Sequence, residues 1–180
     1  MKTKLLPSLT LVALALTATA TIGGHRTFPK KQTGALTPVV KSVFDNYLKI
    51  ESALANESAV GISFNASAIG SAVRADSMNM FPLKVAKQAE ILAGTRNLSS
   101  AREAFKPLSK SLIQYLADHN ITGPYVEVYC PMVKASWIQK DKKINNPYMG
   151  GSMRSCGTIK QKPGASGSDC QLTDNERNQV

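Results

Sequence analysis

Residues 36–55 read LTPVVKSVFDNYLKIESALA and set the fold class. Apolar side chains recur there every three to four residues, which is the period of one helix face. They are Val40, Val43, Phe44, Tyr47, Ile50 and Leu54. Thr37 is a side chain that caps helix N-termini, and Pro38 follows at the first helical position, where a missing N–H costs nothing. This stretch predicts a long amphipathic helix and a mainly helical core.

Three further segments carry weaker versions of the same period. We expect helices over residues 58–75, from about Pro82 to Gly94, and from a capping box at residues 100–103 to a stop near Asn120. Pro107 lies inside the last pattern and should kink that helix or delay its start. With the first helix, these segments predict an antiparallel bundle of three or four helices over residues 36–122.

The period changes after Gly123. Residues 125–130, YVEVYC, alternate and are rich in β-formers, so they predict a strand. Turn formers dominate residues 131–156, and a short second strand is expected near residues 157–160. The predicted fold class is α+β, mainly α: the bundle is followed by a small β-containing module, rich in Cys and Met, at residues 123–162 and packed on the bundle. Residues 163–180 predict a disordered tail.

The N-terminus has the pattern of a secretory signal. A short basic segment precedes an apolar run at residues 5–16, which is too short to span a membrane, and an A-x-A site ends at Ala20. We therefore expect a signal peptide at residues 1–20, cleaved near Ala20, and a flexible leader at residues 21–35. The mature protein is expected to act outside the cytosol, without a membrane span.

Composition narrows the function classes. The 180 residues include 22 Lys and Arg against 12 Asp and Glu, for a net charge of +10, but only 6% aromatic residues. The excess charge is not interleaved with the stacking side chains expected of a single-strand nucleic-acid binder, so we expect no nucleic-acid partner. The sequence has no Cys-x-x-Cys motif, no His near a Cys to activate a thiol and no paired carboxylates. We therefore do not expect an enzyme.

Sulfur side chains concentrate in the predicted β-containing module, at Cys130, Met132, Met149, Met153 and Cys156. Cys130 ends one predicted strand and Cys156 precedes the other, so pairing of those strands would bring the two sulfurs together. The turn at residues 146–151 would aim methionines inward. Thiolates and thioethers are soft ligands that favour Cu(I). These residues therefore form a candidate soft-metal site, on which Trp137 could pack and exclude water.

The same spacing has a second interpretation. Two cysteines at strand ends in an exported protein most simply form a disulfide, with the methionines as ordinary core filling. Cys170 falls in the predicted tail and is expected to be an unpaired or intermolecular thiol. The spacing of the residues leaves both interpretations of Cys130 and Cys156 open.

The module also carries a motif that is similar to a known domain. Its parts, in order, are Tyr129-Cys130-Pro131-Met132, Ala135-Ser136-Trp137, residues 144–148 (INNPY) with Gly150, and Ser152-Met153 with Cys156-Gly157. Together they resemble a bacterial domain of unknown function, which occurs as small exported proteins and fused to periplasmic adaptor subunits of heavy-metal efflux pumps. Tyr47-Leu48, Arg102 and Phe105 extend the resemblance into the helical part, so that it covers about residues 36–160.

The resemblance implies a periplasmic protein linked to copper or related metal handling. Its motif makes Cys130, Met132, Met153 and Cys156 the implied ligands; Met149, the fifth candidate, occupies a position where the family often has an aromatic residue. The expected function is Cu(I) binding as a chaperone, a buffer or an accessory to heavy-metal efflux. The expected partners are an efflux adaptor or other periplasmic copper proteins. The alternative is a non-enzymatic interaction module that docks to an efflux adaptor, with a Cys130–Cys156 disulfide.

Overall fold

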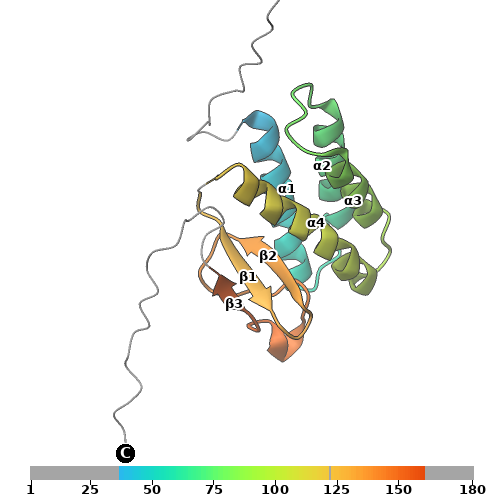
Figure 1. Ribbon diagram of the computed structural model, residues 1–180. Helices are drawn as coiled ribbons and strands as arrows, with labels where there is room; N and C mark the ends of the chain where they lie inside the picture. Colours follow the sequence, from blue (N-terminus) through green and yellow to red (C-terminus); the bar gives the residue numbers. More distant parts are fainter. Residues whose placement is uncertain (1–36, 122, 161–180) are drawn as a thin grey trace, which may run out of the picture. The chain divides into compact units, whose positions relative to one another are not determined.

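Four helices and a three-stranded antiparallel sheet make up the part of the chain that the computed structural model describes, residues 37–121 and 123–160 (Figure 1). The helices are α1 (Pro38–Ala55), α2 (Ile62–Ala75), α3 (Leu83–Ala93) and α4 (Leu98–Asp118). The strands are β1 (Val126–Cys130), β2 (Ala135–Gln139) and β3 (Thr158–Lys160), and a short 3-10 helix, η1 (Gly151–Met153), precedes β3. The predicted α+β class, mainly α, is confirmed.

Helix α1 forms as its sequence predicts. The Thr37 hydroxyl accepts a hydrogen bond from the backbone N–H of Val40 at 3.4 Å, and Pro38 occupies the first helical position. All six apolar side chains of its predicted stripe are buried. Burial of that stripe supplies most of the stability of such a helix, because helices in proteins are stabilised mainly by packing of an apolar face rather than by intrinsic propensity.

The helices and the sheet share one hydrophobic core. The apolar faces of all four helices contribute to it, and so do Val128, Cys130, Trp137 and Ile138 from the sheet. The rings of Tyr47, on α1, and Phe105, on α4, stack with their centroids 4.8 Å apart. The backbone N–H of Ile138, on β2, donates a hydrogen bond to the Tyr47 hydroxyl at 3.1 Å. The sheet is thereby fixed to the bundle through β2.

Two helix starts differ from those predicted. Helix α2 begins at Ile62 rather than near residue 58, because Gly61 takes a left-handed conformation with φ +79° and ends the preceding turn. Helix α4 begins at Leu98, before the predicted capping box. The side chain of Asn97 accepts the Ser100 N–H at 2.8 Å and acts as the N-cap, a role in which Asn equals Ser.

Pro107 does not delay the start of α4. The helix runs from Leu98 to Asp118 with Pro107 inside it. Its neighbours Phe105 and Leu108 are fully buried, and so is Leu112 one turn further on. We attribute the persistence of the helix to this burial, which offsets the hydrogen bond that proline removes.

Strand β2 was not predicted from the sequence, because turns were expected throughout residues 131–156. The strand order is β2-β1-β3, which makes β1 central, and Val128 lies opposite Trp137. Trp137 and Ile138 point to opposite faces of the strand and are both fully buried. A strand buried on both faces lacks the alternation by which strands are recognised.

Several predictions fall on residues outside the described ranges. They concern the signal peptide at residues 1–20, the leader at residues 21–35, the tail at residues 163–180 and Cys170. Within the described ranges, the helices include none that is both long enough and apolar enough to cross a membrane.

Candidate metal centre

Pairing of β1 with β3 brings two cysteine sulfurs together. The strands are antiparallel, with Tyr129 opposite Thr158, so Cys130 at the end of β1 lies beside Cys156 just before β3. Their Sγ atoms are 3.1 Å apart and are not joined in a disulfide. Cys130 is fully buried and Cys156 is half-buried. A pair of thiols thus sits at the junction of core and surface.

The pKa values of the two thiols are shifted in opposite directions. Burial raises the pKa of Cys130, but backbone N–H groups of Val133 and Met132 donate hydrogen bonds to its sulfur and lower that pKa. Hydrogen bonds from the Cys156 thiol and the Asn146 amide lower it further, and the net pKa of Cys130 lies below its ordinary value. The pKa of Cys156 is raised, chiefly because its thiol donates to Cys130. Cys130 is therefore the first of the two to become a thiolate.

The distance between the Cys130 and Cys156 sulfurs lies between that in a disulfide and that in a metal-bound pair of thiolates. A disulfide has its sulfurs about 2.05 Å apart. A metal held by bonds of about 2.3 Å sets two ligand sulfurs about 3.8 Å apart in tetrahedral geometry and about 4.6 Å apart in a linear one. From 3.1 Å, either oxidation or metal binding requires a movement of roughly an ångström. The geometry therefore suits both states of Cys130 and Cys156.

Two of the three candidate methionines do not turn inward as predicted. The side chain of Met132 is 61% exposed and that of Met153 is 36% exposed, while Met149 is half-buried. The interior is occupied instead by Tyr148 and Trp137, both buried, whose rings meet edge-on with centroids 5.9 Å apart. The structure thus brings the two cysteines together and leaves two of the thioethers exposed to solvent.

Trp137 packs beside the cysteine pair, at Gly157. A Cβ atom at Gly157 would lie 2.9 Å from the Trp137 ring and 2.9 Å from a Val128 methyl carbon, and Gly157 has φ +157°. Only glycine fits both this contact and this backbone conformation. The close approach places the Trp137 ring against the residue that follows Cys156. That Trp137 excludes water from the pair stays a prediction.

Asn146 organises the loop that returns to Cys156. Its side chain is fully buried. The Nδ2 amide donates to the carbonyl oxygen of Cys156 at 2.6 Å, and Oδ1 accepts the Tyr148 N–H at 2.8 Å. The backbone N–H of Asn146 donates to the carbonyl oxygen of Arg154 at 2.7 Å. The sequence placed Asn146 in a turn and in the motif, but it did not predict these three hydrogen bonds.

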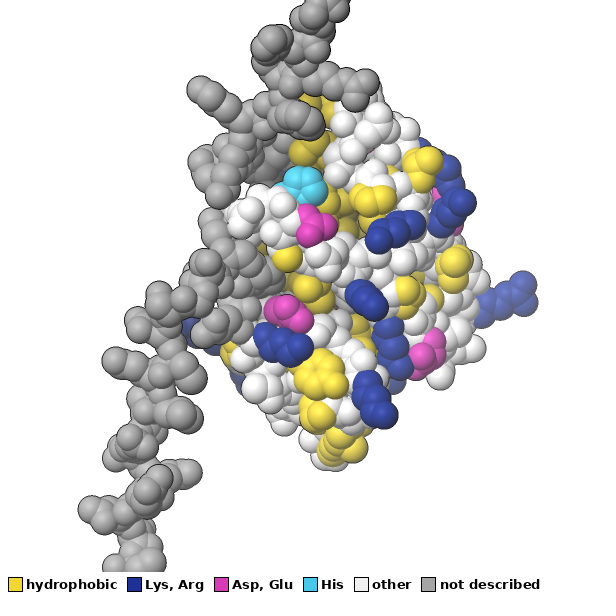
Figure 2. Space-filling model, in the orientation of Figure 1, with side chains coloured by type: hydrophobic (Ala, Val, Ile, Leu, Met, Phe, Trp, Pro, Cys, Tyr) yellow, Lys and Arg dark blue, Asp and Glu magenta, His cyan; other side chains and the backbone are white. Residues whose placement is uncertain are grey.

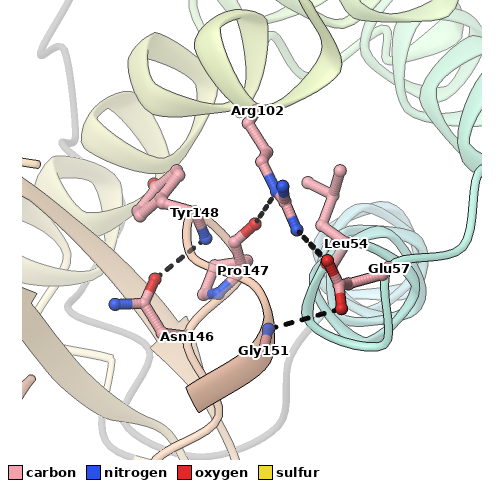
Figure 3. A network of polar contacts seen from close by, with 7 residues as sticks. All are labelled: Leu54, Glu57, Arg102, Asn146, Pro147, Tyr148 and Gly151. Atoms are coloured by element: carbon pink, nitrogen blue, oxygen red, sulfur yellow. Dashed lines mark hydrogen bonds and ion pairs between the residues drawn. The ribbon is translucent and has the colours of Figure 1, made fainter. Parts of the chain in front are cut away.

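Arg102 ties the same loop to the helices (Figure 3). Its Nε donates to the carbonyl oxygen of Pro147 at 3.1 Å, and its Nη2 donates to that of Leu54, at the end of α1, at 3.3 Å. Nη2 also lies 3.8 Å from a carboxylate oxygen of Glu57, whose other oxygen accepts the Gly151 N–H at 3.3 Å. Arg102 and Pro147 both belong to the motif resemblance, which was the sequence signal for this network.

The described residues contain no metal site built from several His, Cys, Asp or Glu ligands. No cluster of three or more His, Cys, Asp and Glu side chains in these ranges could hold a metal ion. The chemistry available at Cys130 and Cys156 is therefore that of a two-thiol pair.

The comparisons with known proteins concern the helical part. Residues 43–123 match the family model Protein of unknown function (DUF3347). The DUF3347 segment includes α2, α3, α4 and most of α1, and it ends before β1. No curated protein and no solved structure matches the chain. The predicted resemblance to a domain of unknown function is confirmed for this segment, whereas the Cys and Met motif lies beyond it and its link to efflux stays a prediction.

Proposed function

We propose that this protein binds Cu(I) through Cys130 and Cys156. One observation carries the proposal: the two sulfurs, 26 positions apart in the chain, converge to 3.1 Å as free thiols. Thiolates select soft ions such as Cu(I), and two of them supply the negative charge that a monovalent cation needs. The pair lies against the hydrophobic core, which limits competition by water.

The protonation of the pair fits metal uptake in steps. The pKa of Cys130 is lowered, so this sulfur is the first thiolate to which the ion would bind. The pKa of Cys156 is raised by its hydrogen bond to Cys130, and a metal would displace that proton. Thioethers carry no proton to lose, so Met132 and Met153, at the surface, would add soft ligands that still bind in acid.

The cellular role in this proposal is that of a periplasmic Cu(I) chaperone, a buffer or an accessory to heavy-metal efflux. Its support is the secretory pattern at residues 1–20 and the motif resemblance over residues 129–157. In such a role the protein would exchange Cu(I) with an efflux adaptor or another periplasmic copper protein. It would do so as a binding protein and not as an enzyme.

A Cu(I) titration tests the proposal. The reduced protein should take up about one equivalent of Cu(I), without oxygen, from a chromogenic chelator, as a single two-thiol site requires. A Cys130→Ser/Cys156→Ser variant should lose that uptake. Met78→Leu, which removes an exposed methionine away from the motif, should retain it and serves as the control. Unchanged affinity in the double variant would eliminate the proposal.

The alternative function is a structural or interaction module with a Cys130–Cys156 disulfide. The sulfur separation of 3.1 Å is compatible with it. On the face crossed by α4, Lys and Arg side chains predominate over Asp and Glu (Figure 2), which would suit an acidic partner surface. A thiol count on protein isolated from its exporting compartment separates the two functions. No free thiol at either position, with no copper uptake before reduction, would favour the alternative.

A further inference from the structure

The backbone of Cys156 is held by one buried side chain. Asn146 Nδ2 donates to the Cys156 carbonyl oxygen at 2.6 Å, and the asparagine is fully buried. This bond joins residues that lie ten positions apart in the chain. Because the carbonyl and the sulfur belong to the same residue, fixing the carbonyl restricts where the Cys156 sulfur can lie.

The rest of Asn146 is fixed as well. Its Oδ1 accepts the Tyr148 N–H at 2.8 Å and its own N–H donates to the Arg154 carbonyl oxygen at 2.7 Å. The buried ring of Tyr148 is anchored in turn by a hydrogen bond of its hydroxyl to the Ser136 carbonyl oxygen, 2.9 Å away on β2. Asn146 therefore connects the start of the loop with its end at Arg154 and Cys156. Through Tyr148 it is also connected to strand β2.

Cys130 is held mainly by the sheet, and the Asn146 amide also donates a hydrogen bond to its sulfur. Cys130 lies in β1, the central strand of the sheet, and is paired with Ala135 of β2. One sulfur thus belongs to a strand paired on both sides, and the other follows a loop whose closure depends on Asn146. Closure of the loop therefore sets chiefly the position of Cys156, whereas strand β1 sets that of Cys130.

We propose that Asn146 is the positioning residue of the thiol pair, and that its side-chain amide holds the Cys156 sulfur opposite the Cys130 sulfur before any metal binds. This inference deepens the proposed function and rests on it where Cu(I) is concerned. Preorganisation of this kind raises affinity because less motion has to be lost on binding. The positioning itself is a property of the two thiols and is measurable without copper.

Asn146→Asp is the test variant, because it is nearly isosteric. The carboxylate keeps an oxygen to accept the Tyr148 N–H, but it replaces the Nδ2 donor with an oxygen that faces the Cys156 carbonyl. Asn145→Asp is the matched control, since it adds the same charge one residue away. At this position the backbone N–H, and not the side chain, donates a hydrogen bond to Gln139 Oε1 at 3.4 Å. Asn146→Ser replaces Asn146→Asp if that variant does not fold.

The first measurement is the equilibrium with glutathione. The two protein thiols react with one glutathione disulfide to give the Cys130–Cys156 disulfide and two glutathione thiols, and the equilibrium constant reports how closely the protein thiols are held. The second is Cu(I) affinity by chelator competition. Removing a side chain that orients a metal ligand typically lowers metal affinity about 10- to 100-fold, and we expect losses of this order in both measurements for Asn146→Asp.

The outcomes of these two measurements decide whether Asn146 positions the thiol pair. A glutathione constant for Asn146→Asp within about twofold of the wild type would overturn the proposal, because that difference is far below the expected loss. An equal loss in Asn145→Asp would also overturn it, since charge alone would then explain the effect. A wild-type chain that forms no internal disulfide would show that the thiols are not held together at all. If the wild type forms the disulfide but takes up no Cu(I), the proposed function fails, and the glutathione constants alone decide the role of Asn146.

Discussion

Arg102 Nε donates a hydrogen bond to the carbonyl oxygen of Pro147 at 3.1 Å, across 45 positions of sequence. Arg102 lies inside the DUF3347 segment, whereas Pro147 lies in the loop that leads to Cys156, beyond that segment. The same guanidinium reaches the carbonyl oxygen of Leu54 at the end of α1. One side chain of the bundle therefore fixes the loop that carries the second cysteine.

Loss of this guanidinium should loosen the loop. We expect Arg102→Ala to lower the free energy of unfolding by about 2 kcal/mol, because two carbonyl oxygens lose a charged donor. Arg102→Lys should recover only part of that loss, since an ammonium lacks the planar fork. Urea denaturation measures both, and Arg96→Ala, at an exposed position, should stay close to the wild type. An Arg102→Ala variant as stable as Arg96→Ala would show that the network contributes nothing.

Gly157 should tolerate no side chain. An alanine Cβ would lie 2.9 Å from both Trp137 and Val128, at a backbone φ of +157°. We expect Gly157→Ala to lower the free energy of unfolding by about 3 kcal/mol, through overpacking and backbone strain. Gly94→Ala is the control, because its Cβ would make only ordinary contacts, at 3.6 Å or more, and its φ is −81°. Thermal unfolding of the two variants compares them, and similar melting temperatures would contradict the predicted packing.

The hydroxyl of Tyr47 should stabilise the junction of helices and sheet. It accepts the Ile138 N–H at 3.1 Å and lies 2.9 Å from the Ser109 hydroxyl, all in buried surroundings. Tyr47→Phe leaves both groups without this partner, and we expect a loss of about 1 to 3 kcal/mol in unfolding free energy. Tyr129→Phe, at a half-buried position, should change it much less. Chemical denaturation provides the comparison, and equal losses would refute the special role of Tyr47.

Glu51 should make stability fall as pH rises. Burial, with a smaller contribution from the charge of Asp141, raises the pKa of Glu51 from 4.5 to about 8, and its Oε1 has no hydrogen-bond partner. Between these values the folded protein keeps a proton that the unfolded chain releases. The free energy of unfolding should therefore decrease with increasing pH across that window, by up to about 1.4 kcal/mol per pH unit.

Glu51→Gln should remove this pH dependence and be more stable than the wild type above pH 8, because it carries no charge to bury. Denaturation midpoints from pH 5 to pH 9 measure the effect. Glu103→Gln, at an exposed carboxylate, serves as the control and should keep the wild-type slope. A wild-type slope in Glu51→Gln would mean that another group is responsible.

The helices could be predicted from the sequence because each carries its own apolar stripe and its own start or stop signal. Thr37 and Pro38 mark the beginning of α1 without help from the rest of the chain. The start of α4 was misplaced because Asn97 and Ser100 are both good caps, and local sequence does not rank them. Strand β2 was missed because Trp137 and Ile138 are buried on opposite faces, which erases the alternation.

The sequence by itself determined the mainly helical class, the strand that ends at Cys130 and the strand that follows Cys156. It could do so because periodicity and turn residues act over a few neighbours. Only the tertiary structure decided that the two sulfurs lie 3.1 Å apart, that Met132 and Met153 stay exposed, and that Asn146 and Arg102 hold the loop. Those relationships join residues ten to fifty positions apart. They depend on how helices and strands pack, which short-range sequence patterns do not encode.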